Sequence, residues 1–300
     1  MTTRKKKRTS KATSDDELSV AVVQCALGDA RELNVARVVG HIRDAAELGA
    51  RIVLPPELFH GPYFPSGHDE AHFAWAEPAD NPTLRRFCAL AKELDVVIPY
   101  SFFERAGQAY YNSLAMIDAT GEVLGVYRKA HIPEGPGYHE KFFFRPGDTP
   151  ITVWDTRHGR IGVGICWDQW FPELARVLSL RGAEILLYPT AIGSEPRSGE
   201  RTKEPWQRVM VGHAVANSIP VAAANRIGDE GKLVFYGASF LCDPRGNLLG
   251  ELGPDESGVL VHAFDRVALA ERRASWGFFR DRRPDLYRAL LAADGTEPSR

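Results

Sequence analysis

The chain has 300 residues, with 37 Lys and Arg against 39 Asp and Glu, so its formal net charge at pH 7 is -2. This balance gives no reason to expect a nucleic-acid or anionic-membrane partner. No apolar stretch approaches the length of a transmembrane helix and the N-terminus lacks the apolar region of a secretory signal, so we expect a cytoplasmic protein.

The first half of the chain alternates predicted strands and helices after a polar tail. Residues 1–16 carry a basic run from Arg4 to Arg8 and are expected to form a disordered arm. Glu57 comes just after the second predicted strand, and Lys129 just after the last one of this half. Apolar periodicity predicts strands over 18–24, 51–54, 96–103, 109–118 and 122–127, and helices over 32–48 and 82–94.

The second half continues the alternation after a loop over 130–148, which has Glu140 in its middle. Cys166 lies at the exit of a predicted strand over 161–165. The alternation in both halves indicates one layered α/β domain over 17–273. Residues 274–300, rich in aromatics and arginine, could pack on a partner subunit or dock on their own domain. The remaining predictions are helices over 173–181 and 204–218, and strands over 151–154, 184–188, 220–225, 237–243, 248–252 and 258–264.

The four cysteines are widely scattered, with no C-x-x-C pair and no histidine spacing typical of a zinc site. In a reducing compartment we expect them as free thiols. Cys25, Cys88 and Cys242 fit core positions, whereas Cys166 is followed by a turn rich in polar and aromatic groups. Taken alone, Cys166 fits a buried structural thiol as well as a nucleophile presented at a strand-to-helix turn.

Three polar residues share one kind of position, because Glu57, Lys129 and Cys166 each follow a predicted strand. Glu140 lies on the loop after Lys129. In layered α/β folds the carboxyl ends of strands form the crevice that binds ligands, so these side chains are expected to converge. A carboxylate, an amine and a thiol form the set that acyl transfer requires: a base, an oxyanion stabiliser and a nucleophile.

Four segments extend this pattern: Leu54-Pro-Pro-Glu57-Leu-Phe59, Tyr127-Arg-Lys129-Ala-His131-Ile-Pro133, Tyr138-His-Glu140-Lys-Phe-Phe-Phe-Arg-Pro146-Gly147-Asp148 and Gly162-Val-Gly-Ile-Cys166-Trp-Asp-Gln-Trp-Phe-Pro-Glu173. In order and spacing they resemble the motifs of the nitrilase superfamily of carbon–nitrogen hydrolases. The resemblance covers roughly residues 20–287. It implies a four-layer αββα sandwich with a Glu57–Lys129–Cys166 triad and Glu140 beside it.

The resemblance also implies a mechanism and makes a metal or other cofactor unnecessary. A free thiol has a pKa of about 8.5, so Cys166 needs Glu57 as its base, and the charge of Lys129 favours the thiolate. Lys129 and the backbone N–H of Trp167 are expected to stabilise the oxyanion, an effect of about 3 kcal/mol per donor. Glu140 is expected to orient Lys129 and the substrate nitrogen. Since these groups activate the carbonyl, no cofactor is expected.

Further segments resemble the branch of the superfamily that hydrolyses N-carbamoylputrescine to putrescine, carbon dioxide and ammonia through a cysteine thiocarbamate. They are Cys166-Trp-Asp-Gln-Trp-Phe-Pro-Glu173, Tyr188-Pro-Thr-Ala-Ile-Gly-Ser-Glu-Pro196, Gly212-His-Ala-Val-Ala-Asn217 and Arg280-Asp-Arg-Arg-Pro-Asp-Leu-Tyr287. Superfamily members form dimers that build larger assemblies, so a homo-oligomer is expected.

The expected partner is a small molecule with a carbamoyl group and a cationic tail. Hydrolases of N-carbamoyl amino acids place adjacent arginines shortly after the cysteine, where this chain has Gln169 and Trp170. No bidentate carboxylate clamp is therefore evident. Glu195 is the candidate anion for the far ammonium, with aromatic walls around the methylenes. Tyr63, Trp170, Gln169 and Thr190 complete the predicted pocket.

Two alternatives stay open. The enzyme could be an amidase or ureidopropionase-type hydrolase that acts on another carbamoyl or amide compound. From another class, the chain could be a non-catalytic assembly subunit that kept the fold, although the presence of all four key residues argues against it.

Overall fold

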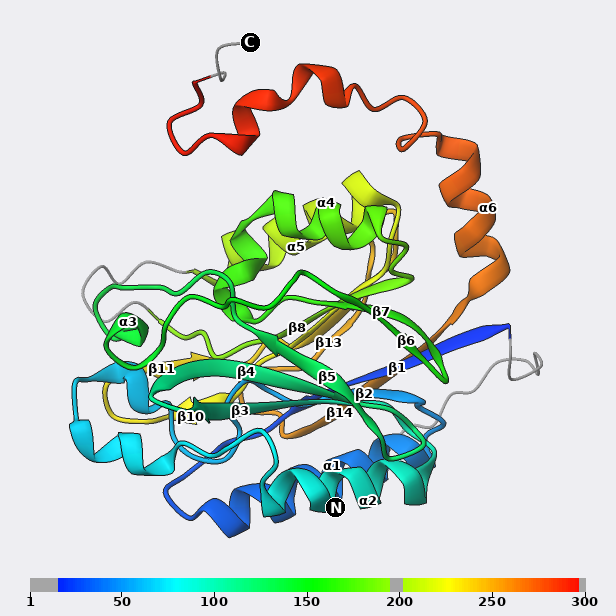
Figure 1. The fold of residues 1–300 in the computed structure, drawn as a ribbon. Coiled ribbons are helices and arrows are strands. Elements are labelled where there is room, and N and C mark those ends of the chain that lie inside the picture. Colours follow the sequence, from blue (N-terminus) through cyan, green and yellow to red (C-terminus); the bar gives the residue numbers. More distant parts are fainter. Residues whose placement is uncertain (1–15, 195–201, 297–300) are drawn as a thin grey trace.

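Two β-sheets stack between two pairs of helices in the computed structural model, which describes residues 16–194 and 202–296 (Figure 1). In the first sheet, β1 pairs antiparallel with β14 and parallel with β2. The Val53 N–H donates to the Val97 carbonyl at 2.9 Å, which joins this group to an antiparallel β3-β4-β5 group. The strands are β14 (Gly258–Asp265), β1 (Glu17–Gln24), β2 (Ile52–Leu54), β3 (Ile98–Ala106), β4 (Ala109–Ile117) and β5 (Val123–Arg128).

The second sheet has six strands in the order β13-β12-β9-β8-β7-β6. Its centre is parallel, since β8 pairs in parallel with both β7 and β9, and antiparallel strands flank that centre. The strands are β13 (Leu248–Glu251), β12 (Phe240–Cys242), β9 (Val221–Ala224), β8 (Ile185–Pro189), β7 (Gly159–Val163) and β6 (Val153–Thr156).

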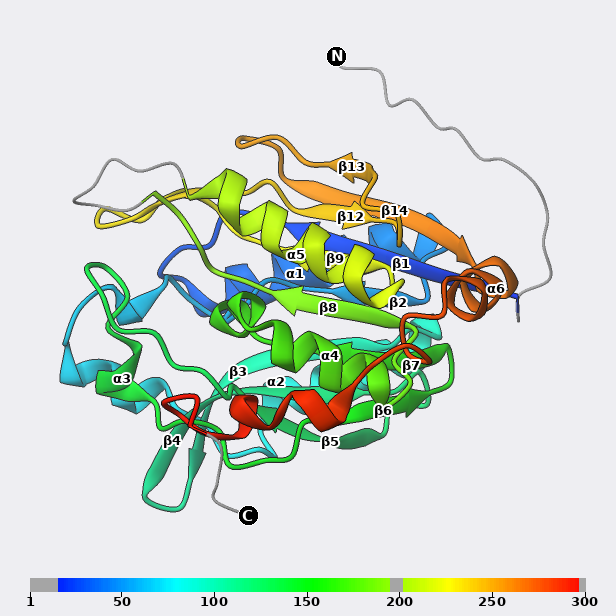
Figure 2. The same cartoon turned by 90° about the horizontal axis from the view of Figure 1, so that it is seen from above.

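One pair of helices covers the outer face of each sheet. Helices α1 (Arg31–Glu47) and α2 (Pro82–Leu94) lie on the first sheet, and α4 (Pro172–Leu180) and α5 (Lys203–Asn217) lie on the second (Figures 1 and 2). Helix α2 begins where the Asn81 side chain accepts a hydrogen bond from the Leu84 N–H at 2.8 Å, and it ends at Leu94, just before Asp95, which has a φ of 53°. The expected αββα sandwich is thereby confirmed.

The four layers enclose three apolar cores. Because side chains alternate between the two faces of a strand, one strand can contribute to two of these cores. In β1, Leu18, Val20 and Val22 point into the core between the sheets, while Ala21 and Val23 pack toward α1 and α2. A third core lies between the second sheet and α4 and α5. The central strands are therefore buried on both faces, as their nearly continuous apolar sequences require.

Several elements were not predicted from the sequence. A hairpin of β10 (Ile227–Asp229) and β11 (Val234–Tyr236) lies between β9 and β12, and α6 (Arg266–Trp276) follows β14. The segment between β2 and α2 contains the short helices η1 (Phe64–Ser66) and η2 (Glu70–Trp75). Within the described ranges, no helix is long and apolar enough to cross a membrane.

Candidate active site

The ends of three strands bring the predicted catalytic residues together. Lys129 directly follows β5, and its N–H donates to the Asn112 carbonyl on β4 at 2.8 Å. Glu57 comes three residues after β2. Strand β7 ends at Val163, earlier than the predicted 165, so Cys166 also lies three residues past its strand. The carboxyl ends of these strands thus form the crevice expected for this layered fold.

Lys129 lies at the centre of a buried cluster of charges. Its Nζ is 2.9 Å from Glu57 Oε1, and 2.9 Å and 2.7 Å from the two carboxylate oxygens of Glu140. All three side chains are fully buried. Asn112 Nδ2 donates to Glu57 Oε1 at 2.7 Å, and the Tyr63 hydroxyl donates to Glu140 Oε1 at 2.6 Å. The second Glu57 oxygen, Oε2, is buried and has no hydrogen-bond partner among the described residues.

Cys166 has an unusual backbone conformation for a residue with a side chain, with a φ of +42°. A left-handed conformation costs about 1–2 kcal/mol for such a residue, and it persists only where the surroundings enforce it. Its side chain is buried, and Sγ lies 3.9 Å from the Ala191 carbonyl oxygen. The sharp turn therefore presents the thiol from the first residue of the short helix η3 (Cys166–Trp170).

Asp168 holds this turn through both of its carboxylate oxygens. Oδ2 accepts hydrogen bonds from the Ile165 N–H at 2.9 Å and from the Tyr127 hydroxyl at 2.8 Å. Oδ1 accepts from the His131 N–H at 3.0 Å and lies 2.7 Å from His131 Nδ1. Tyr127 and His131 flank Lys129 by two residues on either side, so one buried carboxylate fixes the cysteine turn against the lysine segment.

Burial and the neighbouring charges act in opposite directions on the ionisable groups. Burial raises the pKa of the Cys166 thiol well above its usual value, and Glu57 adds to this effect while Lys129 opposes it. For Lys129, burial disfavours the ammonium, but Glu140 and Glu57 outweigh it and raise the pKa. Burial raises the pKa of Glu140 to about 7, against the attraction of Lys129. These shifts favour a neutral thiol beside a charged ammonium in the resting site.

The residues predicted to bind substrate are placed in different surroundings. Tyr63 belongs to the charge cluster through Glu140. Gln169 and Thr190 are fully buried and share a 3.3 Å contact between Thr190 Oγ1 and Gln169 Oε1. Trp170 is partly buried against the core under α4 and α5. Glu195 lies outside the described residues. The backbone N–H of Trp167, the second residue of η3, remains the predicted oxyanion donor.

Two contributors to the site were not anticipated from the sequence, Asn112 and Asp168. Asn112 occupies the middle of β4, where it is fully buried. A polar side chain at a buried strand position requires a hydrogen-bond partner, and that requirement is the signal that could have identified it. Asp168 lies within the quoted cysteine motif, but its partners Tyr127 and His131 are distant in sequence.

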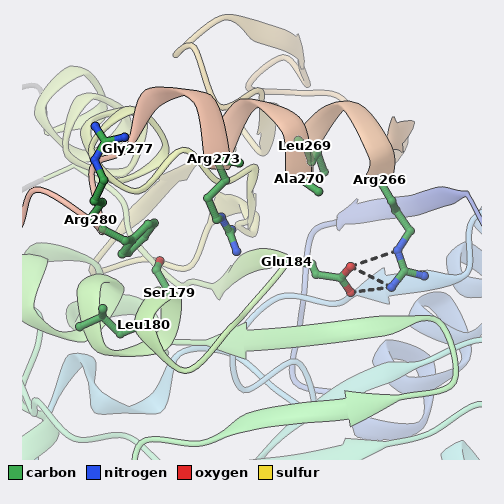
Figure 3. Close-up of a pocket in the computed structure, with 11 residues that line it drawn as sticks. Ser179, Leu180, Glu184, Arg266, Leu269, Ala270, Arg273, Gly277 and Arg280 are labelled. Carbon is green, nitrogen blue, oxygen red and sulfur yellow. Dashed lines mark hydrogen bonds and ion pairs between the residues drawn. The ribbon is translucent and has the colours of Figure 1, made fainter.

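Two further features lie outside the charge cluster. His68, Glu134 and His139 hold ligand atoms within 4.8 Å of one another and could bind a metal ion. A cavity of about 570 Å³ lies between α6 and the α4–β8 side (Figure 3). Glu184 and Arg266 pair across its wall at 2.7 Å. None of the predicted catalytic residues lines this cavity.

Known proteins share both the sequence and the fold of this chain. The family model described as carbon-nitrogen hydrolase matches residues 19–274. An N-carbamoylputrescine amidase from Solanum tuberosum is 51% identical, over 94% of this chain and 97% of the relative. A citrullinase from Francisella tularensis is 49% identical, over 91% of this chain and 98% of the relative. The crystal structure of a carbon-nitrogen hydrolase from Helicobacter pylori superposes with a TM-score of 0.87 at 35% identity, covering 92% of this chain and 99% of that one.

Proposed function

Since the chain belongs to the carbon-nitrogen hydrolase family, whose members hydrolyse non-peptide carbon–nitrogen bonds, we propose that it converts N-carbamoylputrescine to putrescine, carbon dioxide and ammonia. The observation that supports this substrate is the 51% identity, over nearly the whole length of both chains, to an N-carbamoylputrescine amidase. The product putrescine gives the reaction a place in polyamine biosynthesis.

In the proposed first half of the reaction, Glu57 acts as the base for Cys166. Oε1 of Glu57 is occupied by Lys129 and Asn112, whereas Oε2 has no partner among the described residues and is free to take the thiol proton. The thiolate attacks the ureido carbon, and Lys129 with the Trp167 N–H receives the charge on the carbonyl oxygen. The protonated Glu57 then donates its proton to the departing amide nitrogen, which leaves as ammonia.

The second half hydrolyses the thiocarbamate left on Cys166. Glu57 takes a proton from water, the hydroxide attacks the thiocarbamate carbon, and the carbon–sulfur bond breaks as Cys166 recovers a proton. The released carbamate decays to carbon dioxide and the free amine. Glu140 stays hydrogen-bonded to Lys129 throughout, and we propose that it keeps the ammonium aimed at the oxyanion.

A second candidate substrate is citrulline, because a citrullinase is 49% identical to this chain. Citrulline is N-carbamoylputrescine with a carboxylate on the carbon that bears the far amine, so the reacting ureido end is the same. Gln169 and Trp170, which stand where a carboxylate clamp would be expected, favour the substrate that lacks this group. The ratio of kcat/KM for the two compounds measures this preference directly.

Mass spectrometry of protein quenched during turnover tests the nucleophile and the substrate together. The wild type incubated with N-carbamoylputrescine is expected to carry a thiocarbamate on Cys166 and to release putrescine and ammonia. Cys166→Ala is expected to form no adduct and to release neither product. Ammonia release that persists in Cys166→Ala would refute the assigned nucleophile, and a wild type that turns over only citrulline would refute the preferred substrate.

We also propose that the chain forms a homo-oligomer through its C-terminal segment and acts in the cytoplasm. Helix α6 has no buried residue, and the segment after it runs along the α4 side of the molecule (Figures 1 and 2). Large exposed apolar side chains mark interaction surfaces. The double substitution Leu290→Asp and Leu291→Asp is therefore expected to lower the mass measured by light scattering. The exposed residues are Val267, Trp276, Leu286, Leu290 and Leu291.

A further inference from the structure

Two loops beside the charge cluster bring together three side chains that can ligate a metal ion. His68 lies between η1 and η2, and Glu134 and His139 lie on the loop that leads into α3 (Glu140–Phe143). One ligand atom from each lies within 4.8 Å of the others. His68 and Glu134 are exposed and His139 is partly exposed, so an ion could reach all three from solvent.

The contacts around these residues fix the positions of the two loops relative to each other. The His139 N–H donates to the Pro65 carbonyl at 2.7 Å, which ties one loop to the other. His139 Nδ1 lies 2.8 Å from Glu134 Oε1, and the rings of His68 and His139 have centroids 4.2 Å apart. The edge of Phe142 supports the His68 ring, with centroids 5.0 Å apart and planes at 86°. The two loops thus already hold the three ligand groups close together.

We propose that His68, Glu134 and His139 bind a divalent transition-metal ion of the Zn²⁺ type. Two imidazoles and one carboxylate form a ligand set that suits Zn²⁺, with the fourth position open to water. Ca²⁺ and Mg²⁺ prefer sites made of oxygen atoms, so they fit this set poorly. The site is separate from the proposed catalytic residues, and hydrolysis by Glu57, Lys129 and Cys166 does not depend on it.

A bound ion would connect the two segments that contribute Tyr63 and Glu140 to the active site. His139 immediately precedes Glu140, and His68 lies five residues after Tyr63. The Tyr63 hydroxyl and Glu140 Oε1 are themselves 2.6 Å apart. The ion therefore adds a second connection between segments that already meet at a buried hydrogen bond, and it stabilises the folded protein by mass action.

The test uses tag-free Cys166→Ala protein, so that Zn²⁺ cannot bind the catalytic thiol. Isothermal titration with Zn²⁺ is expected to show one ion per chain and a rise in Tm, and Co²⁺ is expected to give visible absorption bands of a nitrogen- and oxygen-ligated ion. His68→Asn and His139→Gln in this background should bind at least about tenfold more weakly, since even losing a supporting partner of a ligand costs about 10–100-fold.

His72→Asn is the matched control, because His72 lies on the same segment but outside the cluster, with its ring against Trp75 at 4.4 Å. It should bind Zn²⁺ like the parent protein. Glu134→Gln is the second cluster variant if His139→Gln unfolds, because Glu134 is exposed. Absence of Zn²⁺ binding in the parent protein, or equal affinity in the parent and the cluster variants, would overturn the proposal.

Discussion

The Tyr127 hydroxyl donates a hydrogen bond to Asp168 Oδ2 at 2.8 Å, which ties the end of strand β5 to the turn that bears Cys166. The lysine and the cysteine are thus held by one carboxylate that also accepts from the Ile165 N–H. Because Asp168 contacts the backbone before Cys166 and not the reacting atoms, we regard it as a positioning residue. Its removal should disturb geometry more than substrate affinity.

Asp168→Asn is expected to lower kcat more than it raises KM. An asparagine keeps the size of the side chain, but one acceptor oxygen becomes an NH₂ group that faces a donor. A buried donor left without a partner costs about 1–3 kcal/mol, which is the expected loss in the free energy of unfolding. Urea denaturation and steady-state kinetics measure both effects. Unchanged kcat in a folded Asp168→Asn protein would contradict the positioning role.

Lys129→Met should destabilise the protein and abolish most of its activity. Two buried carboxylates, Glu57 and Glu140, would lose their shared counter-charge, and breaking such a buried pair costs about 3–5 kcal/mol. The loss in the free energy of unfolding should become smaller as the pH falls, because protonation removes the uncompensated charges. Denaturation at two pH values measures this change. The control is Lys141→Met, which changes an exposed lysine on α3 and should leave the stability unchanged. A loss of stability in Lys129→Met that does not depend on pH would argue against the electrostatic cause.

Glu140 should make the stability of the protein fall as the pH rises from about 4.5 toward 7. Burial raises its folded-state pKa to about 7 from an ordinary 4.5, so the unfolded chain ionises first over this range. The folded state binds more protons there, and stability decreases with pH by up to about 3 kcal/mol before levelling off. Glu140→Gln should flatten this slope in denaturation curves, whereas Glu122→Gln, which changes an exposed carboxylate, should keep it.

Gly147→Ala should displace Lys129 although the two residues are far apart in sequence. The Gly147 N–H donates to the Lys129 carbonyl at 2.8 Å, and an added Cβ would collide with the Arg128 carbonyl and lie 2.9 Å from the Lys129 carbonyl oxygen. Overpacking of this kind costs about 1–3 kcal/mol. Gly135→Ala is the matched control, because its Cβ would have no described atom within 4 Å. Equal activity of the two variants would refute the clash.

The sequence was informative where chemistry coincides with the end of an element. Glu57, Lys129 and Cys166 could be singled out because each follows an apolar run that forms a buried strand. Their convergence follows from the rule that strand ends share one edge of a layered fold. The atomic contacts among them remained out of reach, because side-chain distances depend on how two sheets stack and not on either strand alone.

Other features left little local signal in the sequence. Asn112 sits inside β4, where a single amide does not disturb the apolar pattern that predicts the strand. Helix α6 contributes no fully buried residue to a core, and its Leu269 is only partly buried against the core between the sheets. The β10–β11 hairpin has only three residues in each strand, too few to give a clear alternation.

The burial of Cys166 also bears on how the enzyme survives between turnovers. Oxidation of cysteine to sulfenic acid, and on to irreversible acids, proceeds from the thiolate. Because burial raises the pKa of this thiol, peroxide is expected to meet a poor nucleophile until a base takes the proton, which is the role proposed for Glu57. The burial of Cys166 is therefore also expected to protect the idle enzyme from oxidative inactivation.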